Sequence, residues 1–508
     1  MNRTIRLISL FFVILCSVAM AIGQEQYGTL EITTKDANGA VVPGVAVTVT
    51  STEGTTGFSR TVTTDDQGFA RIPQMRPGTY ELNAAATSGF SVTKLTGVQV
   101  QLGKATQINM QLSSTVGAVV DVTSSEVAVD QTSSDISKTL STEKLELLPK
   151  GGNFSSVLKV IPGTRDESKS GGFSIDGASG AENTFIIDGQ EVTNYRNAGL
   201  AKSQDIPFEM VQEIQVKSSG FNAEFGGATG GVINVVTKGG NNDFHGSFGT
   251  TFEPSGLQGS NRDGLYRWTS GSVGTSSFTQ ETEYFHSPKS DYVNSFPSAN
   301  LSGPIIKNKV WFFGSYSPQV YDTNVRTTFL DNAPPSSRGV IGTEEYHATR
   351  VYNYAFGRID AAPFSKLRLS STYLWNPVED HGVLPYGTVQ FGNPSGTPED
   401  YAKQGGRQTS NNVTFQAVYT PFNNVVGSFR YSRGYLNEKL GNYNIPSGLR
   451  YLCIYGNTPD FDFGPDACNQ GDSDPSNTIT VKDISVRTNY EGDVTFLFSG
   501  CGRHELKG

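Results

Sequence analysis

Apolar and polar side chains alternate with a period of two in many short segments of this chain. In residues 45–50, for example, valines alternate with Ala46, Thr48 and Thr50. Successive side chains of a strand point to opposite faces of a sheet, so a segment of this kind forms a half-buried strand. Short runs rich in Asn, Asp and Gly, which are typical of turns, separate these segments. The regular strands over residues 24–113 therefore predict a β-sandwich.

Residues 114–240 combine helical and strand patterns. Asn153 stands where it could cap a short helix. The apolar face of that helix would consist of Phe154, Val157, Leu158 and Ile161. Two segments rich in β-branched residues, 211–216 and 232–237, predict strands. This region is therefore expected to form a small α+β domain.

The pattern changes again after residue 240. Alternating segments become longer, and aromatic side chains occupy one face, as with Phe415 and Tyr419 opposite Thr414 and Gln416. Residues 241–508 hold 40 of the 54 aromatic residues, more than a small soluble core needs. Strands of about ten residues with an apolar outer face and a polar inner face are typical of a transmembrane β-barrel. In lipid every backbone N–H and C=O group must be paired within the protein, and among sheets only a closed barrel achieves this. The competing interpretation is a soluble sandwich with one wet face.

The first residues read as a targeting segment. Arg3 and Arg6 precede an apolar run over residues 7–21, and small residues follow before Gln24. This order of a basic, an apolar and a small-residue region predicts a secretory signal peptide at residues 1–23. A membrane anchor is the alternative, which the short apolar run disfavours. The mature chain is therefore expected to be exported.

Composition narrows the function classes. The 508 residues carry 39 Lys and Arg against 48 Asp and Glu, a net charge of −9, which has the wrong sign for a nucleic-acid partner. The five histidines all lie at or after His245, and no nucleophile, paired-histidine or nucleotide-binding motif occurs. We therefore expect no enzyme, no cofactor and no metal site.

The cysteines predict one local crosslink. Cys453 and Cys468 bracket a polar, Asp-rich stretch, which suits a single loop disulfide in an oxidising compartment. The acidic residues there are Asp460, Asp462, Asp466, Asp472 and Asp474. Oxygen-rich loops can bind calcium, but this spacing matches no calcium-loop motif, so a solvated acidic loop is favoured.

Residues 24–113 resemble a known domain family. The turn at residues 64–69 and the segment Pro77-Gly78-Thr79-Tyr80-Glu81-Leu82 are similar to the carboxypeptidase-regulatory-like sandwich, which is grouped with the carbohydrate-binding-like folds. The sequence offers no aromatic platform for a sugar in this region. The resemblance therefore implies a spacer or docking module.

Residues 114–240 resemble the plug domain of TonB-dependent outer-membrane receptors. The residues that carry this resemblance are Asp176, Gly177, Asp188, Gly189, Glu224, Phe225, Gly226, Gly230, Gly231 and Asn234. Asp176 and Asp188, each followed by glycine, suit turns in which the carboxylate accepts backbone N–H groups. Whether they also contact the barrel wall stays open. Residues 242–248 and 301–313 resemble barrel strands of the Oar-like branch of these receptors.

The resemblance implies an outer-membrane transporter. Its partners would be the TonB complex of the inner membrane, outer-membrane lipid and an unknown extracellular ligand, for which an oligosaccharide and a peptide are the classes considered. Sandwich and plug would lie on the periplasmic side or in the lumen. TonB would add a strand to an extended segment, for which the candidate residues are Thr115, Val116, Gly117, Ala118, Val119, Val120, Asp121 and Val122. The alternative for this segment is a plain linker strand. The alternative for the whole protein is an adhesion or signalling receptor of the same architecture.

The predicted fold class is mainly β: an Ig- or prealbumin-like sandwich, a small α+β plug and an incomplete antiparallel transmembrane barrel. Residues 241–508 have room for about nine to eleven membrane strands. The resemblance implies that a complete barrel of this family has about twice as many strands. We therefore expect a truncated barrel with an open edge.

Overall fold

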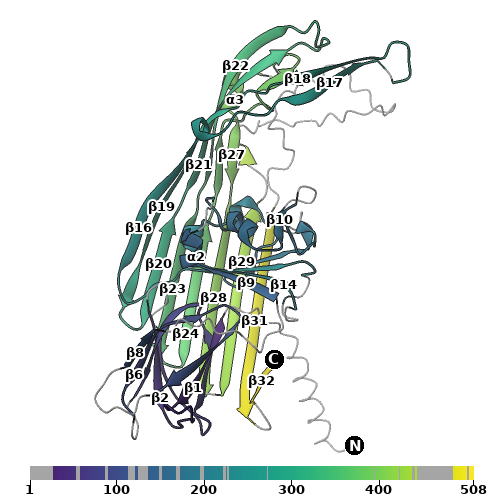
Figure 1. Ribbon diagram of the computed structural model, residues 1–508. Helices are drawn as coiled ribbons and strands as arrows, with labels where there is room; N and C mark the ends of the chain where they lie inside the picture. The colour runs from purple at the N-terminus through teal and green to yellow at the C-terminus, as the bar shows by residue number, and fades with distance from the viewer. Residues whose placement is uncertain are drawn as a thin grey trace, which may run out of the picture.

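The computed structural model describes residues 27–508 except 53–57, 86–89, 113–119, 124–135, 148–150, 168–171, 195–198, 221–224, 226–227, 272, 395, 423, 438–440, 443–483 and 500–502. A curved wall of strands holds a plug against its concave face, and a sandwich lies at one end of the wall (Figure 1). The predicted signal peptide, the cysteines Cys453 and Cys468 and the Asp-rich stretch lie outside the described residues. No helix within the described part has the length and apolar character needed to cross a membrane.

The sandwich consists of two sheets, as the alternating pattern predicts. The first has the order β4-β1-β7, with β1 Gly28–Lys35, β4 Phe69–Met75 and β7 Ala105–Gln111. The second has the order β3-β2-β5-β6-β8, with β2 Ala46–Ser51, β3 Ser59–Thr63, β5 Gly78–Ala84, β6 Thr93–Val100 and β8 Val120–Thr123. Val45, Val47 and Val49 are fully buried between the sheets.

The plug is built on a mixed five-stranded sheet of order β13-β12-β15-β14-β9. Its strands are β9 Ile136–Ser141, β12 Thr184–Ile187, β13 Gln190–Glu191, β14 Val211–Ser219 and β15 Val232–Thr237, and a separate hairpin pairs β10 Thr164–Asp166 with β11 Phe173–Ile175. Its short helices are α2 Thr142–Leu147, η1 Phe154–Val160, η2 Gly180–Glu182, η3 Lys202–Gln204 and η4 Phe208–Met210. The two strands expected from the sequence are β14 and β15.

The helix predicted after Asn153 forms as the 3₁₀ helix η1 and buries Phe154, Val157 and Leu158. Asn153 occupies the N-cap position of this helix, as predicted, but its side chain does not act as the cap. The Asn153 side chain makes no cap hydrogen bond, because its amide oxygen instead accepts from the side chains of Lys202 (3.0 Å) and Gln319 (2.9 Å). The side chain of this asparagine therefore ties the plug to the wall instead of capping the N-terminus of the helix.

Within the described residues, the wall is one sheet of fifteen strands. Its strands are β16 His245–Pro254, β19 Asp291–Ile306, β20 Val310–Tyr316, β21 Gln319–Leu330, β22 Val340–Tyr352, β23 Ala355–Phe364, β24 Leu367–Trp375, β25 Val378–His381, β26 Val389–Phe391, β27 Gly405–Gln408, β28 Ser410–Phe422, β29 Val425–Asn437, β30 Gly441–Asn442, β31 Ile484–Ser499 and β32 Arg503–Lys507. The hairpin of β17 Gly264–Ser270 and β18 Thr279–Phe285, the helix η5 Ser255–Leu257 and the helix α3 Pro398–Ala402 accompany it. The sheet does not close on itself within the described residues.

Several neighbouring wall strands are interrupted at the same level. The backbone pairing nevertheless continues across the interruptions, from Ser317 N to Tyr354 O (2.9 Å) and from Asn376 N to Ser410 O (3.0 Å). Segments such as β20 and β21 therefore continue one another as single long strands. The plug meets the wall at this level, because Tyr354 Oη donates to the carbonyl oxygen of Lys202 (2.8 Å).

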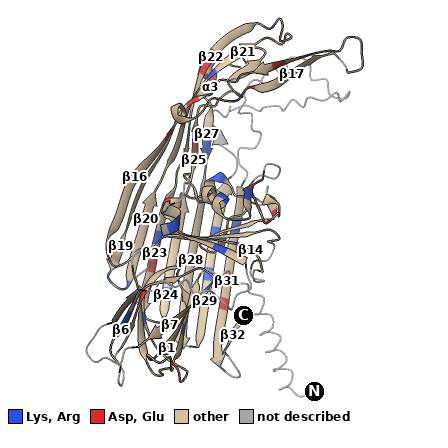
Figure 2. Cartoon of the chain, in the orientation of Figure 1, with Lys and Arg blue, Asp and Glu red and all other residues tan. Residues whose placement is uncertain are grey.

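The wall has an apolar outer face and a polar inner face. On β28, Phe415 and Tyr419 are 37% and 47% exposed, whereas Thr414 and Gln416 are 7% and 8% exposed. Figure 2 shows β16 and β19 almost free of charged residues, while charged residues appear on the plug and on wall strands beside it. This arrangement matches a lipid-facing surface and a wet lumen, and it argues against the soluble-sandwich interpretation.

Candidate functional site

The first element of the site is the turn between β12 and β13. Asp188 and Gly189 both have positive φ, 46° and 77°. The Asp188 carboxylate accepts the backbone N–H of Thr237 (3.0 Å) and its hydroxyl (2.6 Å). The Asp-Gly pattern predicted a turn whose carboxylate accepts a backbone N–H group, and in the structure that group, on Thr237, ties the end of β12 to the end of β15.

A wall arginine completes this turn. Arg358 on β23 lies 3.5 Å from the Asp188 carboxylate and donates to the Thr237 hydroxyl (3.1 Å). Its Nε and Nη2 donate to the two oxygens of Asp360 on the same strand (2.7 and 3.0 Å). The side chains of all three charged groups are less than 10% exposed. Asp188 is therefore both a turn residue and a wall contact, the two roles that the sequence left open.

The sandwich reaches the same cluster. Arg76, which follows β4, lies 3.2 Å from Asp360 Oδ1 and donates to the carbonyl oxygen of Thr237 (3.3 Å). Burial, together with the neighbouring Arg358, lowers the pKa of Arg76. Asp360 is thus shared by two guanidinium groups. We name Arg76, Asp188, Thr237, Arg358 and Asp360 the three-domain charge cluster, because sandwich, plug and wall all contribute to it.

Further polar contacts surround this cluster. Gln190 of the plug donates to Asn412 of the wall (3.2 Å). Arg430 on β29 pairs with Glu491 on β31 (2.6 Å), and its guanidinium packs against Gly189, where a Cβ atom would collide with it. Gly189 is therefore required both by its positive φ and by the close approach of the wall.

The sandwich also binds the plug directly. The backbone N–H of Leu102 donates to the carboxylate of Glu213 (2.7 Å), and the side chain of Gln215 donates to the carbonyl oxygen of Leu102 (2.5 Å). Both plug residues belong to β14, and both are buried. The position of the sandwich is therefore fixed against the plug as well as against the wall.

The other predicted motif residues support the plug internally. Cβ atoms at Gly230 and Gly231 would meet Asn183 and Ile175, and the side chain of Asn183 accepts the N–H of Gly231 (2.8 Å). Asn234 and Phe225 are buried. Asp176 and Gly177 form a turn with φ of 47° and 90°, and among the described residues the Asp176 carboxylate has no wall partner. Glu224 and Gly226 lie outside the described residues.

The predicted TonB-coupling segment is only partly described. Residues 115–119 lie outside the described part of the chain. Val120, Asp121 and Val122 belong to β8, which pairs in parallel with β6 through Thr93↔Val120 and the following pairs. The end of this segment is therefore an added edge strand of the sandwich, and its coupling role stays a prediction.

A cavity of about 630 Å³ opens on the side of the plug away from the sandwich. Lys202 of the plug lines it together with Tyr321, Tyr352, Arg350 and Asp380 of the wall. Lys202 Nζ lies 5.8 Å from the centre of the Tyr352 ring, and Arg350 pairs with Asp380 (2.5 Å). Aromatic rings beside a few fixed polar groups are typical of a ligand pocket.

A buried carboxylate, Asp205, follows the short helix η3 that carries Lys202. Asp205 accepts the backbone N–H (3.1 Å) and the hydroxyl (2.5 Å) of Ser155. Burial raises the pKa of Asp205 to about 6, although nearby Lys202 and these hydrogen bonds act in the opposite direction. Lys202 and Asp205 lie in the same loop. Asn376 of the wall holds this loop, because its side chain donates to the carbonyl oxygen of Ser203.

Sequence reasoning missed four members of the charge cluster: Arg76, Thr237, Arg358 and Asp360. One signal for two of them exists in the sequence. Arg358 and Asp360 stand two positions apart in a strand whose alternate positions are apolar, so they share the inner face. Nothing in the sequence links that pair to Arg76, which is far away along the chain.

Two family models match the chain. The carboxypeptidase regulatory-like domain matches residues 29–113, and the TonB-dependent receptor plug domain matches residues 128–232. In the structure these are the sandwich and most of the plug. Their order agrees with the resemblance found in the sequence.

Curated relatives point the same way. The TonB-dependent transporter Oar of Myxococcus xanthus is 31% identical over 286 residues, covering 54% of this chain and 25% of Oar. The ferrienterobactin receptor of Escherichia coli strain K12 is 31% identical over 132 residues, covering 22% of this chain and 18% of the receptor. The chain thus spans about a quarter or less of the length of these relatives.

Solved structures with a similar fold include the outer-membrane transporter YddB from Escherichia coli, with 14% identity, a TM-score of 0.45 and coverage of 73% of this chain and 47% of YddB. The siderophore receptor PirA from Acinetobacter baumannii has 14% identity, a TM-score of 0.43 and coverage of 73% and 46%.

The two family models and the similarity to Oar agree with a plug held against a wall of outer-membrane type. The chain carries a carboxypeptidase regulatory-like domain followed by a TonB-dependent receptor plug domain.

Proposed function

We propose that this protein takes up an extracellular ligand across the outer membrane by TonB-driven displacement of the plug. The observation that carries the proposal is the three-domain charge cluster, whose ion pairs and hydrogen bonds join a folded plug to the inner face of the wall. The plug also makes an apolar contact with Phe313, Tyr354, Phe356 and Leu374 of the wall. Polar contacts of this kind can be exchanged for water as the plug moves, so the plug can leave its position without the wall unfolding.

The cavity beside Lys202 supports a ligand site on the outer side of the plug. It is bounded by the plug and by wall strands β21, β22 and β25. Short turns join the wall strands at the sandwich end, as at residues 307–309, and longer connections lie at the other end, as at residues 382–404. Because outer-membrane barrels have short periplasmic turns, the cavity faces the cell exterior and the sandwich faces the periplasm.

The energy source in this proposal is the TonB complex of the inner membrane. TonB would pair with residues 115–122 by strand addition, which requires free backbone N–H groups. Replacing Val119 and Val120 with proline removes two of these donors. We expect this double variant to bind ligand at the cell surface but to lose uptake. Unchanged uptake would mean that the segment is a linker only.

Plug displacement is tested with a removable restraint. Gln190 and Asn412 are buried and lie in hydrogen-bond contact across the plug–wall boundary, so a Gln190→Cys, Asn412→Cys variant can be joined by an oxidised disulfide linker that a reducing agent cleaves. Uptake is measured as the set of compounds depleted from the medium by cells with an intact TonB system and not by cells without it. Linked protein should deplete nothing, and cleavage of the linker should restore depletion.

The Gln190→Cys single variant, treated in the same way, is the matched control. Continued depletion by the linked protein would refute the moving plug. Depletion that does not depend on the TonB system, together with altered cell contact, would instead favour the adhesion or signalling receptor.

A further inference from the structure

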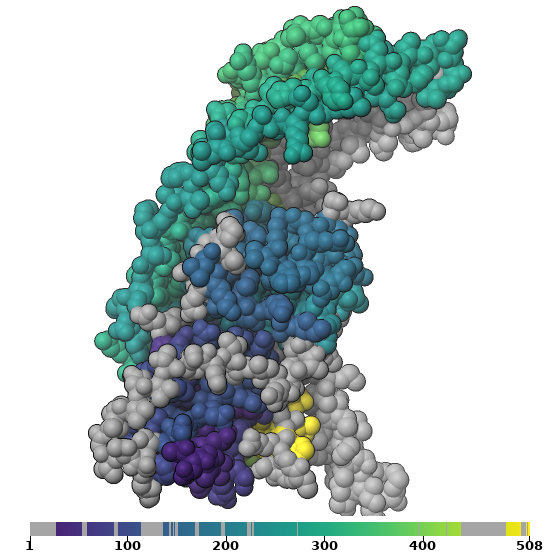
Figure 3. Space-filling model, viewed as in Figure 1, coloured from purple at the N-terminus to yellow at the C-terminus, as the bar shows by residue number. Residues whose placement is uncertain are grey.

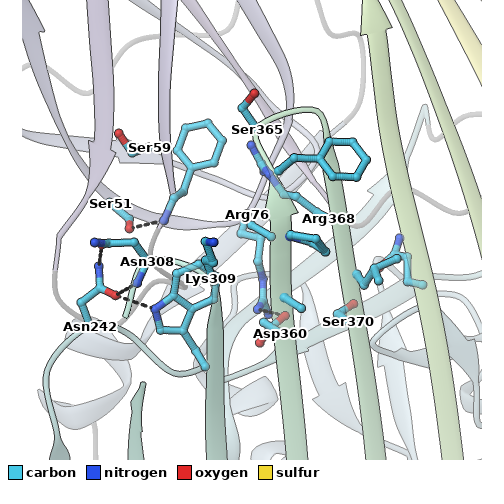
Figure 4. Close-up of a pocket in the computed structure, with 18 of the residues that line it drawn as sticks. Ser51, Ser59, Arg76, Asn242, Asn308, Lys309, Asp360, Ser365, Arg368 and Ser370 are labelled. Carbon is cyan, nitrogen blue, oxygen red and sulfur yellow. Dashed lines mark hydrogen bonds and ion pairs between the residues drawn. The ribbon is translucent and has the colours of Figure 1, made fainter. Parts of the chain in front are cut away.

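A cavity of about 600 Å³ lies where the sandwich meets the wall (Figure 4). It is separate from the outer cavity beside Lys202, because the plug lies between them (Figures 1 and 3). Its lining comes from the sandwich strands β2 and β3, from the turn between β19 and β20, and from β23, β24 and the turn that joins them. A volume of this size can hold a small organic molecule.

The described residues around this cavity are rich in positive charge. Four cations line it, namely Arg76, Lys309, Arg358 and Arg368, against the single carboxylate of Asp360. This sign is opposite to the net charge of −9 of the whole chain. Arg76 and Arg358 are neutralised within the three-domain charge cluster. Lys309 and Arg368 have no carboxylate partner among the described residues.

Arg368 is held in place although it forms no ion pair. Its guanidinium carbon lies 3.8 Å from the centre of the Phe58 ring of the sandwich, an attractive cation–π geometry. Nη1 donates a long hydrogen bond to the carbonyl oxygen of Gln74 (3.5 Å). A guanidinium has five N–H donors, so most of them stay available to a ligand in the cavity.

The remaining lining adds neutral donors on a fixed frame. Hydroxyl groups line the cavity from both bodies, at Thr50, Ser51, Ser59, Ser365 and Ser370. On the wall side, the amide oxygen of Asn242 accepts the N–H groups of Asn308 and of the Trp311 ring, both at 2.8 Å. Arginine, lysine and hydroxyl donors together are the groups that bind phosphate and carboxylate oxygens.

The cavity opens to water rather than to lipid. Arg368, Ser370 and Thr372 lie two positions apart on β24 and so share one face of the wall. Thr372 is 7% exposed, whereas Tyr373 on the opposite face is 49% exposed. The Arg368 side chain therefore projects from the inner face, and in the orientation proposed above a ligand reaches the cavity from the periplasmic end of the lumen.

We propose that this cavity is a binding site for a small soluble polyanion that carries phosphate or carboxylate groups. Lys309 and Arg368 of the wall hold its charged groups, and the serine hydroxyls of the sandwich complete the site. A bound anion contacts both bodies, so its binding also stabilises the docked position of the sandwich.

The experiment uses the detergent-solubilised protein in a phosphate-free buffer and a maltoside detergent, which supplies no phospholipid head group. Pyrophosphate and citrate are the two probes, and binding is measured by titration calorimetry. We expect binding that weakens as sodium chloride is added. Arg368→Gln and Lys309→Gln should each weaken binding about tenfold to a hundredfold, because each removes a charge-assisted hydrogen bond.

Lys366→Gln is the matched control. Lys366 lies in the turn between β23 and β24, but its ammonium group donates to the carbonyl oxygen of Pro421 outside the cavity (2.8 Å). Its replacement should leave binding unchanged. No binding of either probe, or an equal loss in Lys366→Gln, would overturn the proposal.

Loss of the fold is separated from loss of the site by two further measurements. Arg368→Lys keeps the charge without the planar fork, so it should bind more weakly than the unchanged protein and more tightly than Arg368→Gln. The unfolding temperature of each variant is measured without ligand. Lys309 is exposed in a turn, so Lys309→Gln should unfold as the unchanged protein does. Normal binding by that variant would exclude Lys309 from the site and overturn the proposal.

Discussion

Asp360→Asn tests whether the three-domain charge cluster holds the sandwich and plug in the wall. The carboxylate of Asp360 faces both Arg358 and Arg76 at hydrogen-bond distance, and all three side chains are at most 12% exposed. An asparagine keeps the size of the side chain but removes its charge. Two buried guanidinium groups would then share only the Asp188 carboxylate, which lies 3.5 Å from Arg358.

The magnitude follows from the cost of leaving a buried charge without its partner, which is about 3–5 kcal/mol. Arg76→Met makes the informative comparison, because it removes one of the two cations and leaves Arg358 and Asp360 paired with each other. It should therefore cost less than Asp360→Asn. The double variant should cost less than the sum of the single variants, because the two residues contact each other.

Two measurements are made on each variant. The first is the midpoint of unfolding in denaturant, and the second is the rate of proteolysis at the sandwich–wall boundary. Asp360→Asn should lower the midpoint and speed cleavage between the bodies. Lys403→Gln serves as the control, because the Lys403–Glu399 pair lies on the surface and such pairs contribute little. The reasoning is refuted if Asp360→Asn and Lys403→Gln behave alike, or if the single-variant effects simply add.

Three further outcomes are expected. Gly189→Ala should destabilise the seated plug by about 1 kcal/mol or more, since φ is +77° and the Arg430 guanidinium fills the space; an unchanged unfolding midpoint would contradict this. Because the pKa of Asp205 is raised from 3.8 to about 6, its contribution to stability is fully present below pH 3.8 and is lost as pH rises through 6. The stability difference between Asp205→Asn and the unchanged protein should therefore shift by about 2 kcal/mol in favour of the variant between pH 4 and pH 8, and parallel pH profiles would disprove it. Finally, Phe415→Arg should destabilise the membrane-inserted wall by about 2–4 kcal/mol, because it places a charge in lipid. Gln416→Arg places its charge on the inner face and should not have this cost. Equal effects in refolding from detergent would count against the assigned faces.

The conclusions that rested on local sequence were the most accurate. The period-two pattern of Phe415, Gln416 and their neighbours decided which side chains face outward, because adjacent residues of a strand cannot share a face. The Asp-Gly pair at 188–189 predicted a turn, because few residue types accept positive φ. Asn153 takes the predicted N-cap position, but its side chain makes no cap hydrogen bond, because its amide oxygen accepts from Lys202 of the plug and Gln319 of the wall. Local sequence does not show these partners.

Sequence alone thus predicted a sandwich, a small α+β domain and a membrane wall, since each depends on periodicity and turn chemistry within a few residues. The resemblance to a known family identified the α+β domain as a plug. Only the tertiary structure decided that Arg76, Asp188 and Asp360 meet in one buried cluster, and that Lys309 and Arg368 border one cavity with the serines of the sandwich. Those residues lie on separate domains, so their contacts depend on how the domains dock. Coulombic and hydrogen-bond energies act through space over a few ångströms. The spacing of these residues along the chain therefore does not predict that they come into contact.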